Sequence, residues 1–175
     1  LPGGSRDLPA AWAAVEDGTA RLLEHARGAG VRLALEPLHP MYAGDRSCLN
    51  TLEQALDLCD RVEPDPAGAP SLGAAVDVYH VWWDPKLDAQ IARAGRAGRL
   101  FAFHVCDWLV PTRDLLLDRG MMGDGVIDLK RIRRMVEGAG YAGAVEVEIF
   151  SAEDWWRRPV PVILAACAER LQAAC

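Results

Sequence analysis

The sequence predicts an α/β fold of parallel strands, and more narrowly half of an α/β barrel. Short apolar runs alternate with amphipathic helical patterns, an order that pairs strands in parallel. Four ionisable residues stand at or near the carboxyl ends of the four apolar runs: Glu36, Asp77, His104 and Glu148. A barrel brings such ends to one mouth, whereas an open doubly wound sheet spreads them in a row, so we favour the barrel. Because a closed barrel takes eight strands and about 250 residues, a chain of 175 residues is expected to form only the last four strands and their helices.

The first half of the chain predicts two helices and one strand. Apolar residues recur at steps of three and four over 8–26, which is one face of a helix, and Gly28 follows as a stop. The run 31–36 is short and largely apolar and is closed by Pro37, as a buried parallel strand would be. Residues 50–54 then offer helix-capping side chains.

The second half continues this alternation. Strands are expected over 72–78, 100–105 and 144–150, and helices from Asp84-Pro85 to Gly95 or Gly98, from about Asp128 to Gly138 or Gly140, and from about Pro161 to the C-terminus. An N-cap aspartate followed by a proline is typical of a helix start. The Pro- and Gly-rich stretch 64–70 is interpreted as a linking loop, because the same alternation resumes after it. We therefore expect a single partial domain over 1–175, with the N-terminal strands of the barrel absent.

Composition narrows the class of function. The chain is 51% hydrophobic and 25% charged, as in an ordinary soluble domain. A formal net charge of -6 and a pI near 5.2 argue against nucleic acid as a partner and favour a small molecule. No apolar run is long enough to span a membrane and no secretory pattern opens the chain, so a cytoplasmic protein is expected. The five cysteines form no CxxC pair, which argues against disulfides and thiolate zinc sites. A homo-oligomer stays open.

The four strand-end residues predict one metal site. Carboxylates and an imidazole suit a divalent ion such as manganese, magnesium, cobalt or zinc. An unpaired carboxylate buried in a barrel mouth is costly, and a cation offsets that cost. For Glu36 or Asp77 alone a structural ion pair would be the better interpretation, but the set of four favours a metal.

Motifs at these strand ends resemble a known family. The runs are LALEPLHP at 33–40, NT at 50–51, VDVYH at 76–80, FHVCD at 103–107, GDGVID at 123–128 and VEVEIF at 145–150. They resemble the xylose-isomerase-like TIM-barrel superfamily, nearest to its sugar phosphate isomerase/epimerase group, over nearly the whole chain. The resemblance implies that Glu36, Asp77, His104 and Glu148 bind one divalent ion. It also implies that Glu36 and Glu148 exchange protons with the substrate and that His80 helps to hold a substrate oxygen.

This chemistry defines the leading function and its alternatives. A metal that chelates a carbonyl and an adjacent hydroxyl stabilises the enediolate left when a carbon-bound proton is removed. Two carboxylates can remove a proton and return one, which gives an isomerase or epimerase of a sugar or sugar phosphate. A metal-dependent dehydratase of a polyol ketone, a lyase, and an inactive metal-binding fragment are the alternatives. Zinc endonuclease chemistry is disfavoured by the acidic charge and by only four histidines.

Further residues near the mouth are candidates for substrate binding. His39 and His80 follow their strands by three residues, Trp83 lies in the loop after the second strand, and Arg113 lies in the loop after His104. A histidine in such a loop is equally consistent with simple hydrogen bonding, and a tryptophan with packing. The remaining arginines near the mouth, among them Arg119, are expected to be solvated.

Glu146 and Glu148 share one face of the fourth strand, so by spacing alone either is the ligand. Glu148 is favoured because it lies nearer the strand end, and Glu146 is then expected to be a deeper, buried carboxylate paired with a basic residue. The Gly123-Asp124-Gly125 segment is interpreted as a tight turn, because it lacks the spacing of a dinucleotide fingerprint.

Overall fold

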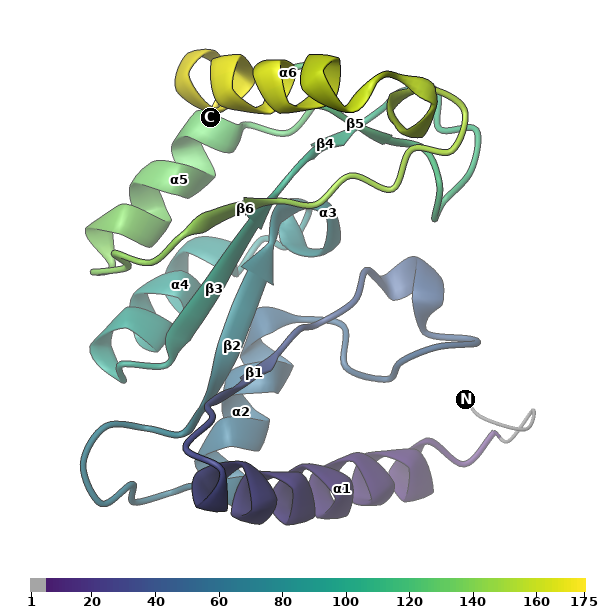
Figure 1. The fold of residues 1–175 in the computed structure, drawn as a ribbon. Helices are drawn as coiled ribbons and strands as arrows, with labels where there is room; N and C mark the ends of the chain where they lie inside the picture. The colour runs from purple at the N-terminus through teal and green to yellow at the C-terminus, as the bar shows by residue number, and fades with distance from the viewer. Residues whose placement is uncertain (1–5) are drawn as a thin grey trace.

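The structure, a computed structural model, describes residues 6–175, so residues 1–5 of the predicted domain lie outside the described residues. Its centre is a four-stranded parallel sheet in the order β1-β2-β3-β6 (Figure 1). The strands are β1 (Leu33–Leu35), β2 (Leu72–Asp77), β3 (Leu100–Val105) and β6 (Val145–Val147). Neighbours along the chain are neighbours in the sheet, which confirms the predicted partial barrel.

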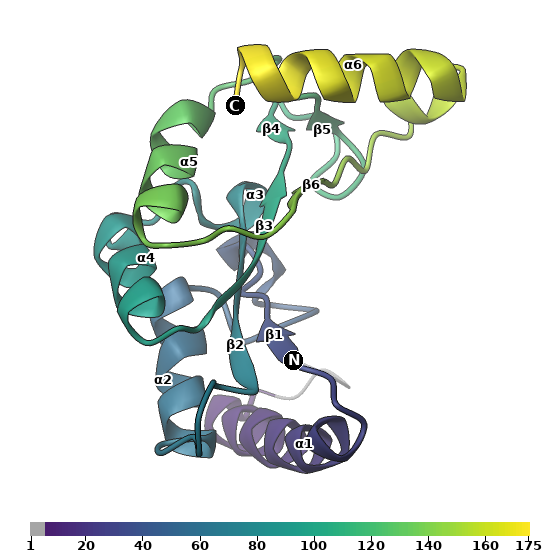
Figure 2. The ribbon, with the colours of Figure 1, turned by 60° about the vertical axis from the view of Figure 1, so that its left-hand side comes forward.

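Three helices connect the strands and cover one face of the sheet: α2 (Leu52–Val62), α4 (Leu87–Arg96) and α5 (Leu129–Gly138). Helix α1 (Leu8–Gly28) precedes β1 and packs against α2, and α6 (Val160–Ala173) follows β6. Figure 2 shows α2, α4 and α5 side by side on that face. Helix α2 begins as predicted, because Thr51 caps it and Gln54 completes a capping box.

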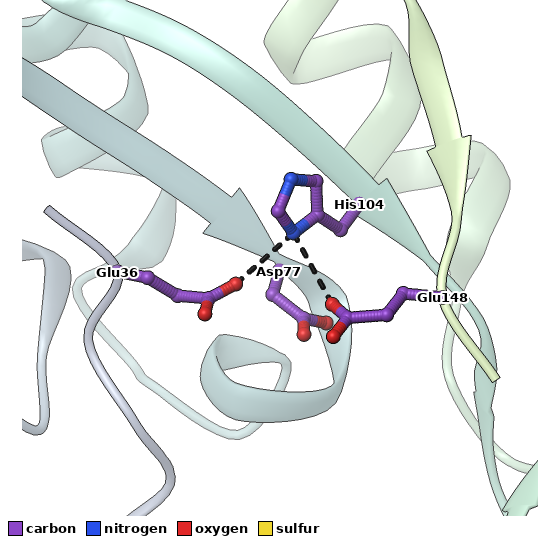
Figure 3. A group of neighbouring side chains, drawn as sticks. All are labelled: Glu36, Asp77, His104 and Glu148. Atoms are coloured by element: carbon purple, nitrogen blue, oxygen red, sulfur yellow. Dashed lines mark hydrogen bonds and ion pairs between the residues drawn. The ribbon is translucent and has the colours of Figure 1, made fainter. Parts of the chain in front are cut away.

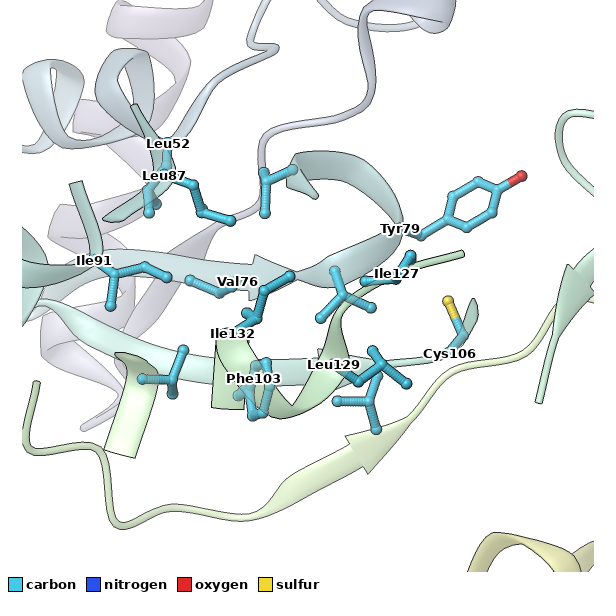
Figure 4. Close-up of a cluster of buried hydrophobic side chains, with 14 of the residues drawn as sticks. Leu52, Val76, Tyr79, Leu87, Ile91, Phe103, Cys106, Ile127, Leu129 and Ile132 are labelled. Atoms are coloured by element: carbon cyan, nitrogen blue, oxygen red, sulfur yellow. The ribbon is translucent and has the colours of Figure 1, made fainter. Parts of the chain in front are cut away.

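The main hydrophobic core fills the space between these helices and the sheet (Figure 4). Leu52 of α2, Val76 of β2, Ile91 of α4, Phe103 of β3 and Ile132 of α5 are each at most 1% exposed. One face of each helix and alternate residues of each strand meet here, as their apolar spacing requires.

The opposite face of the sheet is open at its edges. Ala34 of β1 and Glu146 of β6 are exposed, while their strand neighbours are partly buried. The expectation that Glu146 is buried and paired is therefore wrong. Glu146 lies on an edge strand, on the face that the helices do not cover.

The start of α4 differs from the prediction. Asp84 is no N-cap: its carboxylate accepts a hydrogen bond from the Lys86 amide at 2.8 Å, which forms a turn, and the helix begins only at Leu87. A short helix that the sequence did not predict, α3 (Val78–Val81), follows β2 directly. It turns the chain sharply just beyond Asp77.

A small antiparallel hairpin was not predicted either. It joins β4 (Asp107–Trp108) to β5 (Arg119–Gly120), beyond the carboxyl end of β3. The buried Asp107 carboxylate accepts from the amides of Trp108, Gly123 and Ile127 at 2.9 to 3.0 Å, and so fixes the turn that follows the hairpin. Gly125 in this turn has no room for a side chain, because a Cβ would lie 2.2 Å from the Trp108 carbonyl oxygen. The tight turn is confirmed.

Two short 3₁₀ helices complete the chain, over Pro40–Tyr42 and Trp155–Arg157. Within residues 6–175, no helix has both the length and the apolar composition needed to cross a membrane.

Candidate metal centre

The structure brings the four predicted ligand residues together at the carboxyl end of the sheet (Figure 3). Glu36 directly follows β1, Asp77 ends β2, His104 lies near the end of β3 and Glu148 directly follows β6. Asp77 and His104 are paired in register. One potential ligand atom from each residue lies within 4.8 Å of those from the others. Ligation of a metal by the four remains a prediction.

His104 stands between two carboxylates. Its Nδ1 lies 3.0 Å from Glu36 Oε1 and 3.3 Å from Glu148 Oε2. These interactions, first with Glu148 and then with Glu36, raise the pKa of His104 to about 10 in the absence of a cation. Without a cation, a proton on Nδ1 therefore links His104 to Glu36 and Glu148, and these same three side chains would help to hold a metal.

Asp77 is fully buried and binds Arg119. The Arg119 Nη1 donates to Asp77 Oδ2 at 2.9 Å, and the Tyr79 amide donates to Oδ1 at 2.8 Å. Burial raises the pKa of Asp77 to about 7, the Arg119 charge opposes this rise, and the charges of Glu36 and Glu148 add to it. Asp77 thus adds a third, buried carboxylate to Glu36 and Glu148 at this centre.

Glu148 retains an unused oxygen. The close approach of His104, whose Nδ1 lies 3.3 Å from Oε2, is the first cause that lowers the pKa of Glu148 to about 2, against the effect of burial. Its Oε2 is buried and makes no hydrogen bond of acceptable geometry within the described residues, although His104 and Arg119 lie within ion-pair distance. Such an atom in a buried site usually indicates a missing ion or water.

These observations fit a divalent cation. With His104 neutral, three carboxylates and Arg119 leave a formal charge of about two negative units. The donor set is three carboxylates and one imidazole, with no thiolate, which suits manganese, magnesium, cobalt or zinc. Metal–ligand bonds of about 2.0–2.6 Å allow ligand atoms on opposite sides of an ion to be about 4–5 Å apart, and the separations here fall within 4.8 Å.

Arg119 is the site residue that the sequence analysis missed. It was expected to be solvated, but it is 2% exposed and its guanidinium lies between the rings of Tyr79 and Phe150, at 4.4 and 4.8 Å from their centroids. The strand β5 places it there, through a bond from the Arg119 amide to the Phe150 carbonyl oxygen. Its Nε is buried without a partner in the described part of the chain.

His80 lies beside Asp77 and Arg119. The His80 Nε2 is 3.6 Å from Asp77 Oδ2 and 3.3 Å from Arg119 Nη2, and its Nδ1 accepts from the His39 amide at 3.1 Å. Burial, reinforced by the Arg119 charge, lowers the pKa of His80 to about 3. His80 is therefore a neutral hydrogen-bonding group at physiological pH, and its contact with a substrate oxygen stays a prediction.

His39 and Trp83 form an aromatic wall with Trp108. The His39 ring centroid lies 5.7 Å from that of Trp83 and 5.0 Å from that of Trp108. All three side chains are partly buried, and the Trp83 indole donates to the His80 carbonyl oxygen at 2.7 Å. Contact of His39 and Trp83 with the substrate stays a prediction.

Arg113 is not brought to the four ligand residues. Its side chain is 60% exposed and its guanidinium binds the carboxylate of Asp118, which also accepts from the Arg113 amide at 2.8 Å. Asp118, which precedes Arg119 in the hairpin, holds the Arg113 side chain in the loop between β4 and β5 and so keeps it from the four ligand residues. Arg119, and not Arg113, is the arginine at the centre.

Comparisons with known proteins agree with this architecture. The profile of the family described as xylose isomerase-like TIM barrel matches residues 1–166. The chain is 29% identical over 141 residues to an inosose isomerase of Halalkalibacterium halodurans, covering 75% of this chain and 44% of that protein.

Solved structures show the same relation. A crystal structure of a Sinorhizobium meliloti 1021 protein is 60% identical with a TM-score of 0.94, covering 100% of this chain and 62% of that one. The apo form of a 3-keto-D-glucoside 4-epimerase from E. coli has a TM-score of 0.70 at 19% identity, covering 98% of this chain and 58% of that one, and shows the fold alone. The chain thus spans less than two thirds of the length of these relatives. By its matched profile and its sheet of four parallel strands, it belongs to the xylose isomerase-like TIM barrel family.

Proposed function

We propose that the chain carries the metal centre and the proton-transfer residues of a divalent-metal-dependent isomerase or epimerase that acts on a sugar-like hydroxy-ketone. The observation that carries the proposal is the arrangement of Glu36 and Glu148 on either side of His104 Nδ1, at 3.0 and 3.3 Å. Two carboxylates at one centre are what a reaction needs when it removes a proton and returns one. The isomerase and epimerase among the relatives support the same class.

The residues divide into ligands, proton carriers and donors. A bound divalent ion would polarise a substrate carbonyl and stabilise the negative charge that develops on its oxygen. One of Glu36 and Glu148 accepts the proton from the carbon beside the carbonyl, and the other returns a proton. Return to the other face of the same carbon gives epimerisation, and return to the neighbouring carbon gives isomerisation. His80 and Arg119 present N–H groups from the side of Asp77, where they hold a substrate oxygen.

The positions of Arg113, Arg157 and Arg158 do not favour a phosphorylated substrate, because each of these arginines pairs with a carboxylate of the chain. Arg157 and Arg158, which follow the last strand, pair with Glu153 and Asp154, and Arg113 pairs with Asp118. We therefore propose an uncharged substrate, a sugar ketone or a cyclic polyol ketone.

The proposal is tested by exchange of solvent deuterium into such ketones, followed by NMR, with manganese or magnesium added. Glu148→Gln is expected to lower the exchange rate about 10²- to 10⁴-fold, because a positioned acid–base group contributes that much. Glu146→Gln is the matched control: it lies two residues earlier on the exposed face and should leave the rate within twofold of wild type, a margin of about 0.4 kcal/mol.

Other outcomes decide between the alternatives. Loss of water from the substrate would replace this proposal with the dehydratase. Metal binding without exchange of any ketone would leave the inactive metal-binding fragment. Equal rates in Glu148→Gln and wild type would remove Glu148 from the chemistry.

We propose that the whole protein is cytoplasmic and acts on a small molecule rather than on nucleic acid or membrane. We also propose that it can form a homo-oligomer. Its acidic net charge of -6 supports the absence of a nucleic-acid partner.

A further inference from the structure

His80 has a hydrogen bond whose direction is fixed by chemistry. The His39 backbone N–H points at His80 Nδ1, with 3.1 Å between the two nitrogens. A backbone amide can only donate, so Nδ1 has to present its lone pair. The ring proton of His80 is therefore on Nε2, the nitrogen that faces Asp77 and Arg119.

The Nε2–H group finds no short acceptor among these neighbours. Asp77 Oδ2 lies 3.6 Å away, beyond an ordinary hydrogen bond, and Arg119 Nη2 at 3.3 Å belongs to a guanidinium, which can only donate. With Nε2 protonated, His80 and Arg119 Nη2 each present an N–H, and neither can accept from the other. An oxygen that accepts from both would satisfy the two donors.

The backbone around His39 is held from several sides. The Leu38 amide donates to the Leu49 carbonyl oxygen at 2.9 Å, and the Asn50 side chain donates to the Leu38 carbonyl oxygen at 2.9 Å. On the other partner, Trp83 donates to the His80 carbonyl oxygen at 2.7 Å. The bond between His39 and His80 therefore joins two anchored segments.

We infer that the His39 backbone amide is a positioning group that fixes His80 as an Nε2–H donor, so that the centre accepts a carbonyl or ionised hydroxyl oxygen at this place. This inference rests on the proposed function for its catalytic meaning only. A substrate group that can only donate, such as an ammonium, meets two donors here and is excluded. Under the proposed function, such donors would stabilise the negative charge that develops on the substrate oxygen when a proton leaves the neighbouring carbon.

The hydrogen bond itself is tested by NMR on the metal-free protein without substrate. A scalar coupling between the His39 amide nitrogen and His80 Nδ1 is expected across the bond, together with the ¹⁵N shift of a protonated Nε2. A His80 protonated at Nδ1, or no coupling, overturns the inference whatever the protein turns over. A failed turnover assay leaves the coupling in place, so the two failures are distinguishable.

The role of the amide is tested with His39→Pro. Pro removes the N–H, and the His39 φ of -51° already lies within its range. His39→Ala is the matched control: it loses the imidazole, and with it the bond to the Met41 amide, but keeps the backbone donor. We expect kcat in His39→Pro to fall about 10-fold below that of His39→Ala, as for loss of an outer partner of a site residue. Equal kcat values, with the coupling lost, overturn the positioning role.

A second pair of variants remains informative if His39→Pro fails to fold. His80→Gln places an amide N–H near the position of Nε2, whereas His80→Asn places its amide near Nδ1 and lacks the outer donor. We expect kcat in His80→Asn to lie about 10²-fold below that of His80→Gln, the cost of one preorganised donor. The reverse order, or equal values, contradicts the donor role.

Discussion

At the amino ends of the strands the carboxylate of Glu63 lies between Arg99 and Arg27. At the carboxyl ends Arg119 pairs with Asp77 and Glu148, and His104 pairs with Glu148 and Glu36. Glu63 accepts from Arg99 Nη1 at 2.9 Å, from Arg27, and from the amides of Ser71 and Leu72 at 3.1 Å. Burial alone would raise the pKa of Glu63, but the bonds from Arg27, the two amides and Arg99 outweigh it and lower that pKa.

The two ends therefore use buried charge for different purposes. The carboxylate of Glu63 is fully bonded and matched by positive charge, so it joins α2 to the starts of β2 and β3. At the other end, three carboxylates gather beside His104 and Arg119, and the Glu148 Oε2 makes no hydrogen bond of acceptable geometry within residues 6–175. A buried ion pair whose hydrogen bonds are all made favours a structural role. A cluster of ionisable groups with a buried polar atom that lacks a hydrogen bond favours a ligand-binding site.

The largest expected effect on stability is at the amino end. Glu63→Gln should lower the free energy of unfolding by about 3–5 kcal/mol, because it removes the buried carboxylate that pairs with the buried Arg99; the other partner of Arg99, Asp60 at 3.7 Å, is 55% exposed. Urea unfolding measures this value. Glu53→Gln is the control, since its partner Lys86 is exposed and solvent screens the pair, so the free energy of unfolding should change little. A loss below about 1 kcal/mol in Glu63→Gln would contradict the structural role assigned to Glu63.

The carboxyl end should instead respond to metal. Manganese at about 100 times its Kd should raise the free energy of unfolding by about 2.7 kcal/mol, and a chelator should reverse the gain. His104→Ala should lose most of this response in calorimetry, whereas His25→Ala, an exposed histidine of α1, should keep it. An equal response in both variants would place the bound metal elsewhere.

The smallest effect concerns pH in the metal-free protein. The folded-state pKa of His104 is raised from 6.5 to about 10, so its stabilising contribution is fully present below pH 6.5 and is lost as pH rises toward 10. The expected slope is at most about 1.4 kcal/mol per pH unit. Urea titrations at pH 7 to 9 measure it, and His104→Gln should flatten it. A stability that rises with pH in this window would contradict the hydrogen bonds assigned to His104.

Local patterns predicted much of the fold. Apolar periodicity located α1, α2 and α5 and all four parallel strands, because each buries one face or one run against the same core. Capping at Thr51 was visible because it involves residues three apart. At Asp84 the same signal was wrong, since its carboxylate closes a turn on Lys86 and not the first turn of a helix.

Such local patterns could not predict the hairpin of β4 and β5. Each of its strands has two residues, too few for any periodicity, and Arg119 reaches the centre only through this hairpin. Whether Arg113 or Arg119 lies at the centre depended on which of the two Asp118 binds, and spacing along the chain does not show this. The exposure of Glu146 likewise followed from its place on an edge strand.

The sequence by itself determined that four strands would each end near a carboxylate or imidazole, because strand length and polarity are local properties and parallel strands deliver their ends to one edge. Only the tertiary structure decided which neighbours surround these side chains. Arg119 meets Asp77 across 42 positions of the chain, and Glu36 meets His104 across 68. Contacts over such separations depend on how the helices and loops pack around the sheet, and no spacing along the chain encodes them.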